Sequence, residues 1–105
     1  MITFSQRVIK AALSIPRGRV STYGRIAKAS GGGSMASQSI TAILGKAHDS
    51  GVKNIPFHRI VYADGKVWMS PKYRVLRLKL YKQEGIELDK NNRIKNFSEI
   101  IFDFK

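Results

Sequence analysis

The segment Asn54-Ile55-Pro56-Phe57-His58-Arg59-Ile60-Val61 determines how the rest of this chain is interpreted. Pro56 has a fixed φ angle and lacks a backbone N–H, so the chain enters Phe57 in a defined direction. An aromatic ring, an imidazole and a guanidinium group then follow one another directly. The residues alone leave two interpretations open: the three side chains form a functional cluster, or Phe57 fills the core, His58 is a satisfied buried imidazole and Arg59 is a surface charge.

The composition limits both the size of the fold and its chemistry. A chain of 105 residues forms one domain with a single core, and its apolar fraction of 43% is typical of a globular protein. The absence of Cys excludes disulfides, thiolate metal sites and any thiol nucleophile. Two His without a carboxylate cluster at ligand spacing also argue against zinc, so we expect neither a metal nor a cofactor.

The charge of the chain indicates an anionic partner. Lys and Arg number 19 against 7 acidic residues, which gives a net charge of +12. Nucleic acid is the first candidate partner, a membrane surface the second and a merely solubilising charge the third. No run approaches the ~18 apolar residues of a membrane span, and residues 1–6 lack the layout of a signal peptide, so we expect a cytoplasmic protein without a membrane partner.

The first thirty residues predict two helices. Apolar residues at helical spacing predict a helix over residues 4–13, which Thr3 or Ser5 can cap and which the following Pro and Gly end. A second, shorter helix is expected over residues 21–29, with Ser21 as its N-cap.

Residues 35–47 return to the helical period, with an apolar stripe of Ile40, Ile43, Leu44 and Ala47. The opposite face carries polar, uncharged and short side chains, namely Ser37, Gln38, Ser39 and Thr41. Such side chains would let the backbone of this helix lie deep in a groove. Two short helices joined by a Gly-containing turn predict a helix-turn-helix, and the positive charge favours DNA as its partner. The three glycines between the helices do not form a phosphate loop, because no Gly-Lys-Ser/Thr sequence follows them.

The second half predicts a hairpin and a basic helix. Residues 60–62 and 67–69 are expected to form the two arms of a hairpin around Asp64-Gly65. A helix with a basic outer face is expected over residues 72–83, ending at Gly85. Its inward face is predicted to consist of Val75, Leu76, Leu80 and either Tyr81 or Leu78.

The remaining residues alternate around an Asn91-Asn92 turn, and residues 97–105 are compatible with a strand or a helix. The predicted fold class is therefore mainly α with a short β-hairpin. We expect a winged helix-turn-helix-like single domain over residues 1–105.

Five motifs follow one another along the chain: IPRGRVSTYGRIA at 15–27, LGKA at 44–47, IPFHRIV at 55–61, DGKV at 64–67 and QEGI at 83–86. In their order and nearly in their spacing, they resemble motifs of the C-terminal domain of the alkylguanine-DNA alkyltransferases. Several motifs in register are far more specific than any one of them. The resemblance runs from about residue 3 to residue 88 and does not cover the tail, residues 89–105.

That family binds DNA through a helix-turn-helix in the minor groove and flips an alkylated guanine into a pocket, where the Cys of a Pro-Cys-His-Arg motif takes the alkyl group. Phe57 stands at the Cys position, and phenylalanine has no lone pair to attack an alkyl carbon. The resemblance therefore implies an alkyltransferase-like protein rather than an enzyme. Such a protein binds alkylated guanine in double-stranded DNA without repairing it and marks it for nucleotide excision repair. We also expect a monomer.

Individual site residues follow from the resemblance. Tyr23 matches the family's Tyr that contacts the phosphate and helps to rotate the nucleotide, while His58 and Arg59 match the His and Arg of the motif. Trp68 falls beside the family's pocket loop and is either a pocket or a core residue. The implied lesion pocket consists of Tyr23, Phe57, His58, Arg59, Met69 and Ser70.

Two positions depart from the family pattern. The family inserts an Arg from its recognition helix into the gap left by the flipped base, but counting places Ala42 or Ile40 there. Gln38 or Met35 is then the expected wedge, since Met is used elsewhere as an apolar intercalator. The family's Glu that orients the His falls near Leu78, which implies that the catalytic relay is no longer maintained.

The candidate DNA-contacting residues combine a basic turn, the first helix of the motif and the polar helix face: Arg17, Arg19, Tyr23, Arg25, Ser34, Met35, Ser37, Gln38, Ser39 and Thr41. For the basic turn, solvated surface charge is an equal alternative. The alternative for the whole chain is a general DNA-binding module of the same fold that has lost the lesion pocket, because the inserted Arg is absent.

Overall fold

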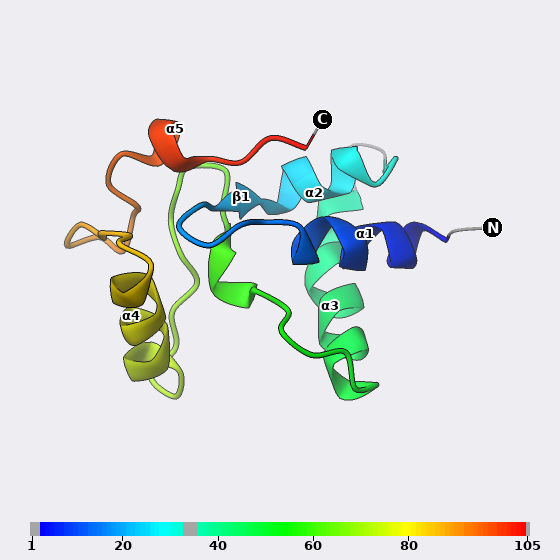
Figure 1. Ribbon diagram of the computed structural model, residues 1–105, viewed down its shortest axis with the longest axis horizontal. Coiled ribbons are helices and arrows are strands. Elements are labelled where there is room, and N and C mark those ends of the chain that lie inside the picture. The colour runs from blue at the N-terminus through cyan, green and yellow to red at the C-terminus, as the bar shows by residue number, and fades with distance from the viewer. Residues whose placement is uncertain (1–2, 33–35, 105) are drawn as a thin grey trace.

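The computed structural model describes residues 3–32 and 36–104 as a mainly helical domain (Figure 1). Its α-helices are α1 (Phe4–Leu13), α2 (Tyr23–Ala29), α3 (Ile40–Asp49), α4 (Arg74–Gln83) and α5 (Phe97–Ile100). Two 3-10 helices, η1 (Ala36–Ser39) and η2 (Phe57–Arg59), and two short strands, β1 (Ser21–Thr22) and β2 (Ile60–Val61), complete the fold. The prediction of a small, mainly helical single domain is confirmed.

Helix α1 begins with a capping box. The Thr3 hydroxyl accepts a hydrogen bond from the Gln6 backbone N–H at 3.1 Å, and the Gln6 side chain accepts one from the Thr3 N–H at 2.9 Å. These contacts satisfy two of the N–H groups that a helix start leaves free. Thr3, not Ser5, is therefore the N-cap, and the predicted span 4–13 is confirmed.

Helix α2 starts two residues later than predicted. Thr22 is the N-cap, and its hydroxyl accepts a hydrogen bond from the Arg25 N–H at 3.1 Å. The expected cap, Ser21, is fully buried in β1 instead, and its hydroxyl donates to the Phe102 carbonyl at 3.2 Å. The prediction for Ser21 was wrong because this residue belongs to a strand that local sequence does not reveal.

The strands pair in a way that corrects the predicted hairpin. β1 and β2 are parallel, with Ser21 opposite Ile60 and Thr22 opposite Val61. The turn at Asp64-Gly65 does form, because the Gly65 N–H donates to the Tyr62 carbonyl at 2.9 Å. The second arm then leaves β2, since Lys66 bridges antiparallel to Arg93. Ile60 and Val61 are both buried, so β2 is covered on two faces, as is usual for a parallel strand rather than for an exposed hairpin arm.

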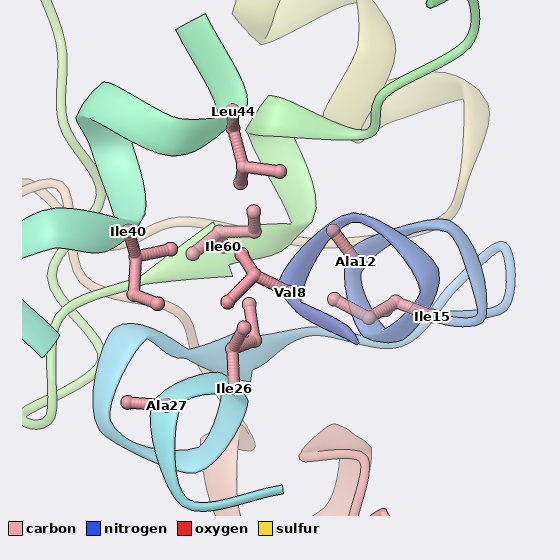
Figure 2. Close-up of a cluster of buried hydrophobic side chains, with 8 residues drawn as sticks. All are labelled: Val8, Ala12, Ile15, Ile26, Ala27, Ile40, Leu44 and Ile60. Carbon is pink, nitrogen blue, oxygen red and sulfur yellow. The ribbon is translucent and has the colours of Figure 1, made fainter. Parts of the chain in front are cut away.

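The two faces of β2 belong to two apolar clusters. The first lies among α1, α2 and α3 and consists of Val8, Ala12, Ile15, Ile26, Ala27, Ile40, Leu44 and Ile60 (Figure 2). The second consists of Val20, Val61, Val67, Tyr81, Ile86 and Ile94. Successive strand residues point to opposite faces, so Ile60 enters the first cluster and Val61 the second.

Helix α4 packs less completely than its sequence predicted. Tyr81 is its buried residue, whereas the side chains of Val75 and Leu76 are 80% and 53% exposed. The predicted inward face was therefore wrong for these two positions. The helix is anchored near its C-terminal end, where the Tyr81 hydroxyl donates to the His58 carbonyl at 2.6 Å. The N-terminal half of α4 leaves apolar side chains at the surface.

The C-terminal residues return to the start of the chain (Figure 1). After α5, Ile101 bridges in parallel to Val20, and the Phe102 N–H donates to the Val20 carbonyl. Phe102 and Phe104 pack against the first cluster. Both forms expected for residues 97–105 thus occur, a short helix followed by an extended segment, and this tail is part of the fold.

Across residues 3–32 and 36–104, no helix is long and apolar enough to cross a membrane. The same residues contain no group of three His, Asp or Glu side chains placed to hold a metal ion.

Candidate functional site

A cavity of about 970 Å³ opens between α3, η2 and α4. Its volume lies at the upper end of the ~300–1,000 Å³ typical of ligand sites. The residues that line it from the two sides include Tyr23, Gln38, Thr41, Phe57, His58, Tyr62, Trp68, Tyr73, Leu76 and Arg77. The cavity is therefore lined on one side by residues of α2, η1 and α3 and on the other by Trp68 and residues at the start of α4.

Aromatic rings form much of this wall. The Tyr23 and Tyr62 rings lie 5.6 Å apart, because each residue directly follows one of the two paired strands. On the α4 side, the Trp68 and Tyr73 rings are 6.2 Å apart. Trp68 is 40% exposed, so it is a cavity residue and the core alternative was wrong. Tyr62 and Tyr73 were not among the predicted site residues, although Tyr62 ends the β-prone run at residues 60–62.

The backbone before η2 directs Phe57 towards the cavity. Asn54 has a left-handed φ of 66°, which Asn tolerates better than most residues. The Phe57 N–H then donates to the Ile55 carbonyl at 2.9 Å, and the Arg59 N–H to the Pro56 carbonyl at 2.9 Å. In the resulting 3-10 turn, Phe57 and His58 line the cavity, whereas Arg59 does not.

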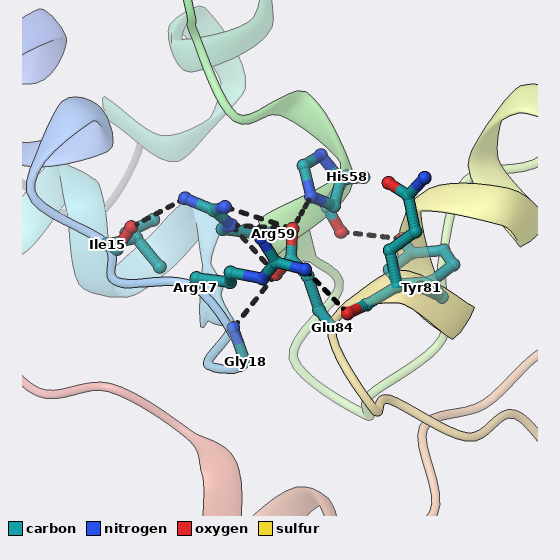
Figure 3. Close-up of polar contacts among 8 residues, drawn as sticks. Ile15, Arg17, Gly18, His58, Arg59, Tyr81 and Glu84 are labelled. Atoms are coloured by element: carbon teal, nitrogen blue, oxygen red, sulfur yellow. Dashed lines mark hydrogen bonds and ion pairs between the residues drawn. The ribbon is translucent and has the colours of Figure 1, made fainter.

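Glu84 lies at the centre of a buried polar network (Figure 3). Its carboxylate accepts hydrogen bonds from the Gly18 N–H at 2.9 Å and from Arg59 Nε and Nη2 at 3.0 and 2.9 Å. The second Arg59 branch, Nη1, donates to the Ile15 carbonyl at 3.0 Å. Gly18 has a φ of +84°, a conformation that favours glycine. The network ties the turn after α1, η2 and the end of α4 together.

The same carboxylate holds His58, which corrects the expectation of a lost relay. His58 Nε2 lies 2.5 Å from Glu84 Oε2, so Glu84 is the partner of His58 and the count to Leu78 was wrong. Glu84 is the C-cap residue of α4, which ends at Gln83. Glu84 is the single acidic residue between positions 65 and 86, and that was the signal in the sequence.

The network fixes the charge of both partners. Burial raises the pKa of Glu84, but hydrogen bonds from Arg59, Gly18 and His58 outweigh it and lower the pKa to about 2. Burial also lowers the pKa of His58 below its ordinary value, against the opposing contact with Glu84. We therefore assign a neutral imidazole with its proton on Nε2, directed at a carboxylate, and a lone pair on Nδ1.

The predicted arginines make intramolecular contacts. Arg17 Nη2 donates to the Gln83 carbonyl at 2.8 Å. Arg19 donates to the carbonyls of Ile100 and Ile101 at 3.0 and 3.2 Å, and Arg25 forms an ion pair with Asp103. All three arginines remain exposed. Their roles in DNA binding stay predictions, and two of the three are engaged by the tail.

The polar face of the second helix reaches the cavity at two positions. Gln38 and Thr41 line it together with Tyr23, whose hydroxyl pKa is raised by burial. Ser37 and Ser39 lie in η1, and the Ser39 hydroxyl donates to the Ala36 carbonyl at 2.8 Å. Ser34 and Met35 lie outside the described residues. Of the two expected wedge residues, Gln38 lines the cavity, and Met35 is not among the residues that the structure describes.

The remaining predicted pocket residues lie elsewhere. Met69 packs against the second apolar cluster, and the Ser70 hydroxyl is buried without a hydrogen-bond partner among the described residues. Arg59 binds Glu84. The structure therefore brings Tyr23, Phe57 and His58 together at the cavity but not these three.

The geometry agrees with the comparison to known sequences. The profile described as 6-O-methylguanine DNA methyltransferase, DNA binding domain, matches residues 3–86. The chain belongs to this family. A search among curated proteins gives no match. Within the family, a chain without any Cys is of the alkyltransferase-like kind.

Similarity to solved structures covers more of this alkyltransferase-like chain than the family profile does, and it includes most of the tail after residue 88. S. pombe Atl1 in complex with damaged DNA containing O6-carboxymethylguanine is 25% identical, with a TM-score of 0.73 over 96% of this chain and 95% of Atl1. S. pombe ATL in complex with DNA gives 27% identity, the same TM-score and the same coverage. Mycobacterium tuberculosis O6-methylguanine methyltransferase is 32% identical, with a TM-score of 0.57 over 77% of this chain but 49% of the other protein.

Proposed function

We propose that this chain is a non-catalytic DNA-binding protein that recognises alkylated guanine. In this proposal the damaged nucleotide is rotated out of the duplex into the cavity beside Tyr23, and the complex marks the lesion for nucleotide excision repair. The protein acts as a monomer, in the cytoplasm, and contacts the minor groove of double-stranded DNA.

The observation that carries the proposal is the cavity with Phe57 in its wall. Extruding a base costs a few kcal/mol of lost stacking, and least for a damaged base. Stacking of a base on an aromatic side chain returns about 1–3 kcal/mol. Phe57, Tyr23 and Tyr62 supply such rings at one site, next to the polar residues Gln38 and Thr41 of the helix-turn-helix.

Binding without chemistry follows from the same residue. Phe57 takes the place of the family's acceptor Cys, and neither its ring nor any other residue of the chain offers a thiol. His58 and Glu84 keep the geometry of a relay, but Glu84 also holds Arg59 and the turn at Gly18. The contact between His58 and Glu84 is therefore part of a network that stabilises the fold, and this role does not require a nucleophile.

Two further features support DNA as the partner. The net charge is +12, and in the described part of the chain acidic side chains form ion pairs with Arg25, Arg59, Arg93 and Lys95. Helix α3 carries the short side chains of Thr41, Ala42 and Gly45, of which Thr41 and Gly45 line the cavity and Ala42 is exposed. A helix with short side chains fits a narrow groove. Atl1, the related protein, is bound to damaged DNA in its crystal structure.

The alternative, a general DNA-binding module without a lesion pocket, is disfavoured by the cavity beside Tyr23. It predicts equal affinity for damaged and undamaged duplexes. The lesion proposal predicts a preference that depends on Phe57.

The decisive experiment is a competition between duplexes that differ in one base, O6-methylguanine or guanine, at fixed salt. We expect the wild-type protein to prefer the methylated duplex. Phe57→Ala should reduce this preference by about 5- to 150-fold, the range that corresponds to ~1–3 kcal/mol of stacking, while binding to undamaged duplex changes little. The intact mass of the protein should be unchanged after incubation with the methylated duplex.

Phe104→Leu is the matched control, because Phe104 packs against the same apolar cluster without lining the cavity. It should leave the preference intact. Equal wild-type affinity for both duplexes would support the general module instead, and an alkyl adduct on the protein would show that an acceptor other than Cys exists.

A further inference from the structure

Helix α4 carries exposed apolar side chains that the cavity does not account for. Trp68, Tyr73 and Leu76 are exposed but line the cavity. Val75 and Leu78 are also exposed, at 80% and 39%, and are not among the residues that line it. Single exposed apolar residues are common on proteins, but these two are neighbours, one helical turn apart. Their position indicates a surface that another molecule covers.

Val75 and Leu78 belong to one continuous face of α4. Together with Lys79 and Lys82 they stand at positions i, i+3, i+4 and i+7, the spacing of one side of a helix. All four residues are exposed, and we call them the outer face of α4. No ion pair involves either lysine among residues 3–32 and 36–104. The outer face thus combines an apolar pair with two cations that have no acidic partner there.

The outer face lies on the side of α4 that is turned away from the cavity. Leu76, Arg77 and Leu80 line the cavity, whereas Tyr81 is buried. Successive residues of a helix are rotated by about 100° around its axis, so the outer face is roughly opposite Leu80. Helix α4 also stands at one end of the long axis of the molecule, away from α1 (Figure 1). A duplex that delivers a base to the cavity therefore leaves the outer face uncovered.

The chemistry of the outer face fits an acidic, partly apolar protein segment. Val75 and Leu78 form a short seam for apolar side chains, and Lys79 and Lys82 stand where a partner helix can place Asp or Glu. A DNA phosphate would contact the lysines but leave the apolar pair in water. A second copy of this chain, bound through the same face, would bring like charges together.

We propose that the outer face of α4 is a docking site for an acidic amphipathic helix of a partner protein. The partner packs apolar side chains on Val75 and Leu78 and pairs its carboxylates with Lys79 and Lys82. The interface is small, so the contact is weak and transient. This inference deepens the proposed function and rests on it, because a protein that marks a lesion needs a surface that its duplex leaves free.

The probe is a fluorescein-labelled helical peptide with Leu at positions i, i+3, i+4 and i+7 and Glu at the flanking positions. One control peptide has Gln in place of each Glu, and a second has Ser in place of each Leu. Fluorescence anisotropy should show saturable binding of the acidic peptide with a Kd below about 1 mM, and binding about tenfold or more weaker for both controls. The Kd should be the same for the free protein and for its complex with an O6-methylguanine duplex.

Val75→Ser combined with Leu78→Ser should weaken binding of the acidic peptide about tenfold or more, because both apolar contacts are lost. The preference for the O6-methylguanine duplex should not change. Leu13→Ser is the matched control, because Leu13 is exposed on α1 and does not line the cavity. It should leave peptide binding intact. Circular dichroism and thermal melting establish that each variant is folded.

A charge exchange tests the two lysines. Lys79→Glu combined with Lys82→Glu should abolish binding of the acidic peptide and allow binding of a peptide with Lys in place of each Glu. Lys10→Glu combined with Lys90→Glu makes the same change in net charge at two other exposed positions. This control variant should keep the preference for the acidic peptide.

The outcomes separate this inference from the proposed function. Equal binding of the Glu and Gln peptides, or no effect of Val75→Ser with Leu78→Ser, would overturn the docking site. Displacement of the peptide by duplex would show that DNA covers the outer face, and self-association that this double variant abolishes would show that a second copy does; either result also overturns it. Equal affinity for guanine and O6-methylguanine duplexes would instead overturn lesion recognition, whatever the peptide does.

Discussion

At the scale of single residues, Glu84 determines how the cavity is held. Its side chain is 5% exposed and accepts hydrogen bonds from the turn at Gly18 and from both His58 and Arg59. Removing one partner of a buried ion pair costs about 3–5 kcal/mol, because the other charge is left without compensation. The residue that the sequence comparison misplaced is therefore central to the stability of the site.

Glu84→Gln should lower the free energy of unfolding by about 3 kcal/mol at pH 7, measured by urea denaturation. The folded pKa of Glu84 is about 2, below its ordinary value of 4.5, so its contribution is complete above about pH 4.5 and is lost as the pH falls towards 2. The wild type should thus lose stability over this range more steeply than the variant.

Glu87→Gln is the control, since Glu87 forms an exposed pair with Lys95 at 4.0 Å. Its effect should stay within about 1 kcal/mol, as for other surface pairs. Identical acid-dependence in the wild type and Glu84→Gln would contradict the assigned role of Glu84.

At the scale of elements, the tail binds two of the arginines that are predicted to contact DNA. Its carbonyls bind Arg19, and Asp103 pairs with Arg25 on α2. Both partners of the second pair are well exposed, at 42% and 60%, so the contact contributes little to stability. An Arg25 that is paired with Asp103 is less available to a phosphate.

Asp103→Asn should therefore change the free energy of unfolding by less than about 1 kcal/mol. It should also strengthen binding to undamaged duplex at low salt and steepen the plot of log K against log salt by about 0.9, the value of one additional phosphate contact. Binding is measured by fluorescence anisotropy at four salt concentrations.

Glu99→Gln removes the same charge from α5, where no ion pair involves it among the described residues. An equal increase in affinity for both variants would mean that net charge alone, rather than release of Arg25, is responsible.

The elements were predictable where their signals are local. The helices over 4–13 and 72–83 follow from periodicity and caps. The structure contains the first with the predicted bounds and the second from Arg74 onward. The parallel pair was not predictable, because Ser21–Thr22 and Ile60–Val61 are two residues long and 39 positions apart. A strand of two residues is too short to show a hydrophobic period, and the pairing of these two strands depends on their burial on both faces.

At the scale of the whole molecule, we expect the excess of positive charge and the cavity to contribute independently to DNA binding. Lys and Arg release counterions from any duplex, whereas a neutral adduct adds no phosphate contact. The sequence alone gave this charge and the motifs that place Phe57 and Tyr23. It could not place Trp68, Tyr73 and Arg77 around the cavity, because they reach it only through the packing of α4 across η2.

We therefore expect affinity for guanine and O6-methylguanine duplexes to fall with equal slopes when log K is plotted against log salt. The ratio of the two affinities should stay constant between about 50 and 200 mM salt. Titrations of both duplexes at each salt concentration measure this ratio. A preference that fades as salt rises would show that lesion recognition is electrostatic and not due to the aromatic wall.

The parallel pairing of β1 with β2 has a consequence for how the proposed lesion site can diversify. Thr22 and Val61 are joined through their main chains, and the residues that follow them, Tyr23 and Tyr62, inherit that spacing. We therefore expect that other cavity-lining residues, such as Trp68, Tyr73 and Leu76, can be substituted without displacing Tyr23 and Tyr62. A library at these three positions should yield proteins tuned to adducts of different bulk on one unaltered scaffold.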